Sequence, residues 1–273
     1  MPELPEVETI RETLKQCVLN QKIVDVQVHY PKLIQNMDVQ LFAKKLIGQT
    51  FNEIMRKGKY LIFHLSDGFL IVHLRMEGKF YYDYHHIDRH SHLIFTFDNQ
   101  KNLVYHDVRK FGRMVYYDKN VDIYQVLPLS QLGKEPFELK DGTYFYQKIK
   151  KSQKPLKQIL LDQTILAGIG NIYADEICFA SRLSPLKKGN TLTLKDCNEL
   201  IKQAKIVLSK AIQLGGSTIK SYHSAQGIDG LFQNELMVYG KKGKPCPICH
   251  QPIVKIKVSG RGTHYCPNCQ KED

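Results

Sequence analysis

The first eight residues, MPELPEVE, contain groups that suit covalent catalysis. If Met1 is removed, Pro2 carries a free secondary amine, and an α-amino group with a pKa near 8 is about one tenth unprotonated at pH 7. Such an amine attacks a sugar aldehyde carbon and gives a cationic iminium, the intermediate of Schiff-base catalysis. Glu3 adjoins this amine, and Glu6 lies on the same helical face as Glu3. A simpler interpretation stays open, because Pro and Glu both suit the first turn of a helix.

Four of the seven cysteines form two Cys-x-x-Cys pairs near the end of the sequence, Cys246 with Cys249 and Cys266 with Cys269. This spacing is typical of a zinc ribbon, in which four thiolates bind one structural Zn²⁺. In a reducing compartment a metal site is favoured over disulfides.

The chain has 273 residues, enough for two ordinary domains, and carries a net charge of +12. An excess of Lys and Arg indicates a polyanionic partner, and nucleic acid is favoured over a membrane. The sequence shows neither a signal-peptide core nor an apolar run of membrane-spanning length. We therefore expect a cytoplasmic protein with no membrane partner.

The elements that must position these groups differ between the two halves. Residues 5–18 predict a helix, because Val7, Ile10, Leu14 and Val18 recur at helical spacing. Residues 41–46 suggest a second short helix. Many short strands separated by turns then predict an antiparallel sandwich or barrel. The expected strands cover residues 23–30, 51–57, 60–66, 69–74, 79–84, 93–97, 103–107 and 114–117.

The second half is predominantly helical. Residues 155–162 suggest a short helix, and a second helix follows a glycine pair, Gly168 and Gly170, whose bare N–H groups suit a phosphate. An ordinary turn between helices is the alternative. Thr193 predicts the N-cap of a long helix that two glycines end near residue 214. Residues 217–232 have the composition of a loop.

Three segments of the β-rich half carry polar groups beside strand ends: KGKY (57–60), HLRMEG (73–78) and DVRKFG (107–112). Taken singly they are unremarkable, since a lysine beside a turn is usually solvated. Met76 and Phe111 would usually be buried in the core.

Together with PELPEVET, GIGNIYA (168–174) and the four-cysteine tail, these strings resemble the formamidopyrimidine-DNA glycosylases over the whole chain. The resemblance implies an α+β fold: an N-terminal antiparallel β-sandwich with a leading helix, then a C-terminal helical domain with a helix–two-turns–helix element and the zinc ribbon. The implied domains are a catalytic domain (1–130), a linker (131–150), a DNA-binding domain with a lesion loop (151–232) and a zinc finger (233–273). In the linker Lys134 replaces the first proline of the family's LGPEP string.

The implied function is base-excision repair. The enzyme would remove oxidised purines, chiefly 8-oxoguanine and formamidopyrimidines, from damaged double-stranded DNA, then cut the abasic strand by β,δ-elimination, acting as a monomer. The implied catalytic residues are Pro2, Glu3, Glu6, Lys59 and Arg261. The implied DNA-contacting residues are His73, Met76, Glu77, His90, Arg109, Phe111, Lys151 and Asn171.

Within that set, Met76, Arg109 and Phe111 would fill the hole left by the flipped nucleotide, and Arg109 would bond the orphaned base. Glu77 would lie near the lesion, while His90 and Lys151 would contact the DNA backbone. His250 stands where the family usually has glycine, but four thiolates already complete the metal site.

Two alternatives remain. The endonuclease VIII type, which acts on oxidised pyrimidines, shares the Pro-Glu start, the helical turn and the ribbon. It usually begins PEGPE, whereas this chain has Leu4, and the Arg109-x-Phe111 pair favours the purine enzyme. A non-catalytic zinc-ribbon DNA-binding protein would keep the charge and the metal site but lack the nucleophile.

Overall fold

The structure is a computed structural model that describes residues 1–217 and 230–271. It divides into two compact units, Met1–Ser130 with Gly215–Gly230, and Gln131–Leu214 with Leu231–Asp273. The sequence pattern groups residues 215–230 with the helical region, whereas the structure groups the described residues of this range, 215–217 and 230, with the first unit. Most of the expected lesion loop, residues 218–229, lies outside the described residues.

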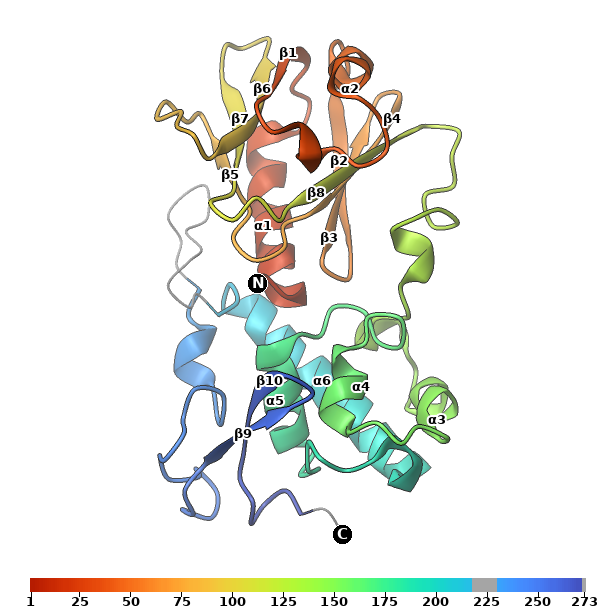
Figure 1. The fold of residues 1–273 in the computed structure, drawn as a ribbon, viewed down its shortest axis with the longest axis vertical. Helices are drawn as coiled ribbons and strands as arrows, with labels where there is room; N and C mark the ends of the chain where they lie inside the picture. The colour runs from red at the N-terminus through yellow and green to blue at the C-terminus, as the bar shows by residue number, and fades with distance from the viewer. Residues whose placement is uncertain (218–229, 272–273) are drawn as a thin grey trace. The chain divides into compact units, whose positions relative to one another are not determined.

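The first unit contains two four-stranded antiparallel sheets, with strand orders β1-β6-β7-β5 and β2-β3-β4-β8 (Figure 1). The strands are β1 (Ile23–Val28), β2 (Phe51–Lys57), β3 (Tyr60–Leu65), β4 (Gly68–His73), β5 (Lys79–Tyr82), β6 (Ser91–Phe97), β7 (Asn102–His106) and β8 (Arg113–Asp118). The predicted α+β class with N-terminal antiparallel strands is therefore confirmed, and each expected strand exists near its expected bounds.

Aromatic rings join the two sheets into one core. Phe51 of β2 meets Phe63 of its own sheet edge-on at a centroid distance of 5.4 Å. The same ring meets Phe95 and Phe97 of β6, in the other sheet, at 5.8 Å each. Such edge-to-face contacts stabilise more than burial of their area alone.

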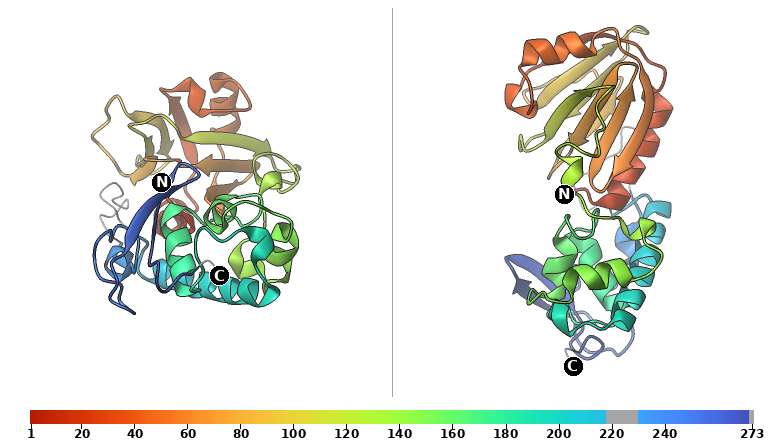
Figure 2. Two further views of the ribbon diagram at one scale, coloured as in Figure 1. Left: turned by 60° about the horizontal axis from the view of Figure 1, so that its bottom comes forward. Right: turned by 90° about the vertical axis from the view of Figure 1, so that its right-hand side faces the viewer.

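Helix α1 (Leu4–Val18) lies along β2 and β3, as Figure 2 (right) shows. Its apolar residues Val7, Ile10, Leu14 and Val18 are buried in the shared core, which confirms the predicted stripe. Helix α2 (Val39–Leu46) begins at Asp38, whose carboxylate accepts the N–H of Leu41.

The second unit packs α3 (Thr143–Ile149), α4 (Leu156–Leu161), α5 (Asn171–Ala180) and α6 (Leu194–Gln213) around one core, and the hairpin β9 (Val254–Val258)–β10 (Arg261–Tyr265) contacts α5. Short 3-10 helices cover Pro31–Leu33, Leu129–Gln131, Pro136–Glu138, Gly189–Thr191 and Phe232–Glu235. The predicted capping box is present, since Thr193 and Asp196 bond each other's backbone N–H groups. No described helix has the length and apolar character to cross a membrane.

The buried face of α1 generates the first prediction. Leu14→Ala should lower the free energy of unfolding by about 2–5 kcal/mol, because it leaves a cavity in the core. Urea unfolding measures this loss. Gln16→Ala on the exposed side of the same helix is the matched control and should change the free energy by less than about 0.5 kcal/mol. Equal losses for the two variants would contradict the packing described for α1.

Candidate active site and metal centre

The N-terminal segment is ordered and buried rather than frayed. Pro2 is buried, Glu3 is only 2% exposed, and α1 begins immediately afterwards at Leu4. Glu3 and Glu6 form a capping box, in which the Glu3 N–H donates to Glu6 Oε2 at 2.8 Å. The box fixes the direction in which the chain enters α1, so Pro2 and Glu3 have defined positions.

The other oxygen of Glu6 binds the segment that follows α6. Glu6 Oε1 accepts the backbone N–H of Ser217 at 2.8 Å and the Ser217 hydroxyl at 3.0 Å. Gly216 approaches the same carboxylate so closely that a Cβ there would lie 2.9 Å from Glu6 Oε1. Its φ of +80° also favours glycine. The backbone conformation and the lack of room for a Cβ therefore both account for a glycine at position 216.

The surroundings of the terminus favour an unprotonated amine. Burial lowers the pKa of the Met1 amino group below its ordinary value, the nearby Glu3 and Glu6 carboxylates oppose this shift, and the positive charges of Lys59 and Arg109 add to it. A lowered pKa enlarges the fraction of free base at neutral pH. These four side chains therefore lie within electrostatic reach of the terminus.

Lys59 stands in the tight turn between β2 and β3. Lys57 pairs with Tyr60, so Gly58 and Lys59 form a two-residue hairpin loop. Gly58 has φ of +56°, which matches the glycine that a type II′ turn takes at its first central position. Lys59 is 4% exposed, so the expectation of an ordinary solvated turn lysine is wrong.

The DVRKFG loop is organised by Asp107, which the motif contains but whose role was not predicted. This fully buried carboxylate accepts backbone N–H groups from Arg109 (3.0 Å), Phe111 (2.9 Å) and Gly112 (2.8 Å). Lys110, at the apex, has φ of +58°. The loop conformation is thus fixed by hydrogen bonds to a single side chain.

Tyr105 explains why both candidate DNA-filling motifs end in glycine. A Cβ on Gly112 would lie 1.8 Å from the Tyr105 hydroxyl oxygen, and one on Gly78 would lie 2.2 Å from it. The HLRMEG and DVRKFG loops therefore both pack against the same phenol ring. A side chain at either glycine would clash with the Tyr105 ring, so the ring or that loop would have to move.

The loops expose the residues that the resemblance assigns to DNA. Phe111 is 51% exposed and Met76 is half-buried, so the expectation that both lie in the core is wrong. Arg109 Nε lies 3.3 Å from Glu77 Oε1, in an ion pair that is partly exposed and therefore weak. Two neighbouring loops thus hold four predicted residues, Met76, Glu77, Arg109 and Phe111.

The two predicted histidines differ in their surroundings. Burial lowers the pKa of His73 to about 3, and its Nδ1 accepts the Arg75 N–H at 2.9 Å, so the neutral ring carries its proton on Nε2. His73 lines a cavity of about 360 Å³ with residues that include Arg75 and Arg113. His90 is half-buried beside His106, and its carbonyl accepts the Asp107 N–H.

Lys151, Asn171 and Arg261 belong to the second unit. Asn171 opens α5, and its Nδ2 donates to the Gly262 carbonyl at 3.2 Å, which brings it beside the strand that Arg261 begins. Arg261 is exposed, and so is Lys151 just after α3. Within this unit the structure joins Asn171 to the zinc-ribbon hairpin, a connection that no local sequence pattern indicates.

A buried charged network fixes that connection. Lys157 is fully buried, and its Nζ donates to Asp175 Oδ1 at 2.6 Å and to the Asn171 carbonyl at 2.7 Å. Asp175 Oδ2 accepts the backbone N–H of His264 at 2.8 Å, which ties α5 to β10. Glu176 similarly accepts three consecutive backbone N–H groups, from residues 237–239. These three residues were not predicted as functional.

The four predicted cysteines come together. The Sγ atoms of Cys246, Cys249, Cys266 and Cys269 all lie within 4.8 Å of one another. Tetrahedral thiolates at about 2.3 Å from Zn²⁺ stand about 3.8 Å apart, and the observed Cys246–Cys269 and Cys249–Cys266 distances are 3.8 and 3.4 Å. The donor set and its dimensions therefore fit a structural zinc ion.

His250 is not part of this cluster. It is exposed, and its φ of +62° lies in the left-handed region that favours glycine. A histidine in place of the family's usual glycine is therefore strained at this backbone position. Among the described residues, the metal-binding group consists of the four cysteines.

Comparison with known families accounts for most of the chain. Residues 1–114 match the formamidopyrimidine-DNA glycosylase N-terminal domain, and residues 132–223 match the H2TH domain of the same glycosylase. Residues 243–271 match a zinc finger found in FPG and IleRS. The zinc-finger match and the cysteine geometry together identify a zinc site.

Relatives and solved structures agree with these matches. Formamidopyrimidine-DNA glycosylase of Oceanobacillus iheyensis is 46% identical and covers 99% of this chain and 98% of its own. The formamidopyrimidine-DNA glycosylase of Listeria monocytogenes is 43% identical, and the match covers 99% of this chain and 100% of the relative. A Lactococcus lactis FPG mutant in complex with Fapy-dG containing DNA has a TM-score of 0.91, 42% identity and coverage of 99% and 100%. The L. lactis enzyme with abasic-site DNA has a TM-score of 0.89, 43% identity and coverage of 98% and 99%. The chain belongs to the formamidopyrimidine-DNA glycosylase family.

Proposed function

We propose that the chain is a base-excision repair enzyme that removes oxidised purines from duplex DNA and then cuts the abasic strand. The observation that carries this proposal is the buried Pro2-Glu3 start of α1, where burial already lowers the pKa of the Met1 amino group one residue before Pro2. The related L. lactis structures hold DNA with Fapy-dG or an abasic site, the substrate and the intermediate of such a reaction.

The nucleophile is the Pro2 nitrogen, once Met1 is removed. Its lone pair forms a bond to C1′, the glycosidic bond breaks, and that electron pair leaves with the base. Opening of the C1′–O4′ bond gives the iminium, which draws electrons from C2′. Loss of a C2′ proton expels the 3′ phosphate by β-elimination, and δ-elimination expels the 5′ phosphate.

Glu3, next to the nucleophile, transfers protons at the sugar, and Lys59 supplies a proton during elimination. Support comes from burial, because both side chains are at most 4% exposed and Lys59 lies within electrostatic reach of the terminus. In the complex with DNA, a general acid or base must come within hydrogen-bond reach of the proton it transfers, directly or through one water. Glu6 acts by fixing Glu3 and Ser217 rather than by proton transfer.

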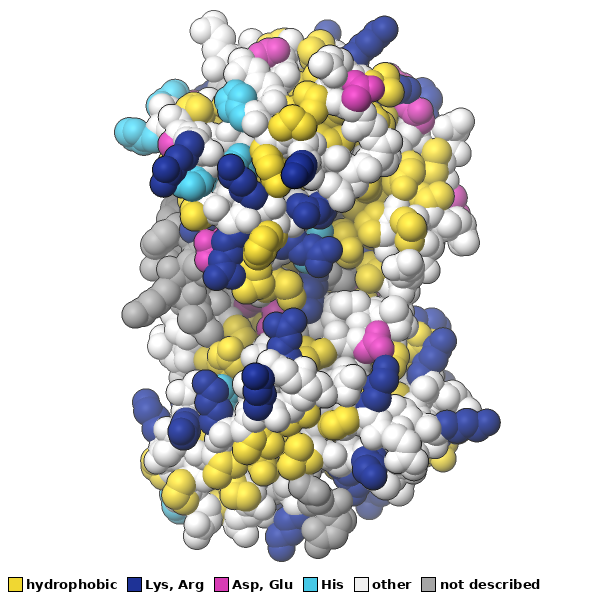
Figure 3. All heavy atoms as spheres, in the orientation of Figure 1, with side chains coloured by type: hydrophobic (Ala, Val, Ile, Leu, Met, Phe, Trp, Pro, Cys, Tyr) yellow, Lys and Arg dark blue, Asp and Glu magenta, His cyan; other side chains and the backbone are white. Residues whose placement is uncertain are grey.

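DNA binding rests on charge and on the two loops joined by Tyr105. Figure 3 shows Lys and Arg side chains over both units, with few Asp and Glu side chains, which agrees with the net charge of +12. Phe111 and Met76 supply apolar groups that fill the space of a flipped nucleotide, and Arg109 bonds the base left opposite. His73, His90, Lys151, Asn171 and Arg261 supply contacts to the backbone.

Arg109 provides a test of base reading. The family resemblance implies 8-oxoguanine opposite cytosine as the main substrate, and Arg109→Ala should reduce this preference for cytosine, because one good base-edge contact is worth about 1–3 kcal/mol of discrimination. Excision is measured on duplexes that carry the lesion opposite C or A. Lys119→Ala, which removes an exposed lysine paired with Asp67, is the control and should keep the wild-type ratio. An unchanged ratio in Arg109→Ala would assign this residue to phosphate or surface charge.

The terminus itself provides a second test. One extra residue ahead of Pro2 should abolish excision, because an acylated proline nitrogen is an amide, while affinity for lesion DNA stays largely intact. Pro2→Gly should keep some activity, since a primary amine also forms a Schiff base. Intact mass confirms each terminus, and excision and binding are assayed in parallel. Full excision by the extended protein would exclude Pro2 as the nucleophile.

Removal of zinc should affect the second unit more than the first. Natively purified protein should contain one zinc ion per chain, and chelation should weaken DNA binding more than it unfolds the β-rich unit, because the cysteines lie wholly in the second unit. Metal analysis, DNA binding and far-UV circular dichroism measure the three quantities. Protein that contains no zinc, or that loses the β-rich unit on chelation, would contradict this assignment.

A further inference from the structure

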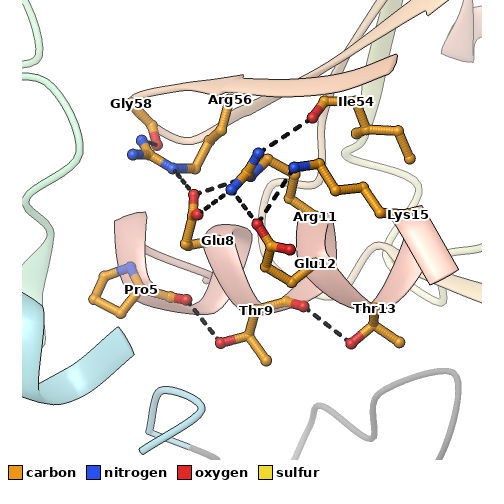
Figure 4. Close-up of polar contacts among 10 residues, drawn as sticks. All are labelled: Pro5, Glu8, Thr9, Arg11, Glu12, Thr13, Lys15, Ile54, Arg56 and Gly58. Carbon is orange, nitrogen blue, oxygen red and sulfur yellow. Dashed lines mark hydrogen bonds and ion pairs between the residues drawn. The ribbon is translucent and has the colours of Figure 1, made fainter. Parts of the chain in front are cut away.

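An ion pair connects α1 to the end of β2, next to the β2–β3 turn, as Figure 4 shows. Arg56 Nε donates to Glu8 Oε2 at 2.8 Å, and Arg56 Nη1 donates to the Gly58 carbonyl at 3.0 Å. The same guanidinium therefore bonds both a side chain of α1 and the backbone of the turn that contains Lys59. A planar guanidinium can bind two partners at once, because its N–H donors point in several fixed directions.

The pair is well shielded. The side chains of Arg56 and Glu8 are 10% and 17% exposed, and Arg11 also donates to Glu8 from within α1. Although burial raises the pKa of Glu8, the hydrogen bonds from Arg11 and Arg56 bring its pKa below the ordinary value. Glu8 is thus an anion with two guanidinium partners, of which only Arg56 also contacts the turn backbone among the contacts drawn in Figure 4.

The bond to Gly58 has a direct effect on the next residue. The peptide unit is planar, so the Gly58 carbonyl oxygen and the Cα of Lys59 lie in one plane. A hydrogen bond that holds this oxygen therefore restricts the position of the Lys59 Cα, from which the side chain extends. At the other end, Glu8 lies about 6 Å along the rigid α1 from its first residue, Leu4, next to the capping box.

We infer that Arg56, held by Glu8, is a positioning residue that sets the Lys59 ammonium group relative to the N-terminal amine. The distance between the terminal amine and the Lys59 ammonium group would then depend on the Arg56–Glu8 ion pair, which does not itself touch the reacting atoms. The inference rests on the proposed function, since it concerns the elimination step assigned to Lys59.

A double-mutant cycle tests the inference on DNA with a preformed abasic site, which bypasses base excision. Arg56→Met should slow strand cleavage about tenfold, while borohydride trapping of the covalent adduct stays within about twofold of wild type. In a Lys59→Ala background the same Arg56→Met change should slow cleavage no further, because residues that act as a unit are not additive. Arg56→Lys should recover part of the loss.

Arg11→Met is the matched control. It removes an arginine that is bonded to the same Glu8, and Figure 4 draws no contact between Arg11 and the Gly58 carbonyl. It should leave cleavage within about twofold. Thermal unfolding checks that every variant folds, and Glu8→Gln, which keeps the side-chain size, replaces Arg56→Met if that variant does not.

A further slowing by Arg56→Met in the Lys59→Ala background would overturn the inference and indicate a general structural role. Equal slowing by Arg11→Met, or a Lys59→Ala variant that cleaves at the wild-type rate, would overturn it too. None of these outcomes affects the proposed nucleophile, because formation of the covalent adduct is measured separately from strand cleavage.

Discussion

The site depends on the Glu6 carboxylate, which binds two segments far apart in the sequence. One oxygen accepts the Glu3 N–H at the start of α1, and the other accepts Ser217 after α6. An N-terminal segment is usually among the least ordered parts of a chain, and an amine on a frayed end would not meet a substrate in one geometry. Because Glu6 lies in the first turn of a helix anchored by an apolar stripe, the core of the first unit fixes the position of Pro2.

Local patterns predicted most elements of the fold. The stripe of α1 and the Thr193 capping box are properties of a few neighbouring residues, and both were confirmed. The pairing of the strands could not be predicted from the residues alone, which left a sandwich and a barrel equally open. The sheet order β1-β6-β7-β5 joins strands far apart in the sequence, and such pairings follow from packing across the core, where Phe51 meets Phe95 and Phe97.

The candidate site was predictable only through whole-chain resemblance, because a lysine in a turn or a phenylalanine in a loop indicates nothing by itself. The burial of Lys59 and the exposure of Phe111 reverse the ordinary expectation for each residue type. Residues that act through others were missed. Asp107 bonds backbone N–H groups rather than ligands, and Lys157 has an acidic partner, Asp175, on another helix, so neither leaves a local pattern. A lysine inside an apolar stripe is nevertheless a sign that a distant carboxylate is buried with it.

We propose that the covalent bond to DNA forms at the terminal amine. The most direct measurement is to reduce the adduct with abasic DNA by borohydride, digest the protein and locate the added sugar mass by tandem mass spectrometry. We expect the modified peptide to begin at Pro2 and to carry the added mass on that residue. A modification on Lys59, the other amine within electrostatic reach of the terminus, would contradict it.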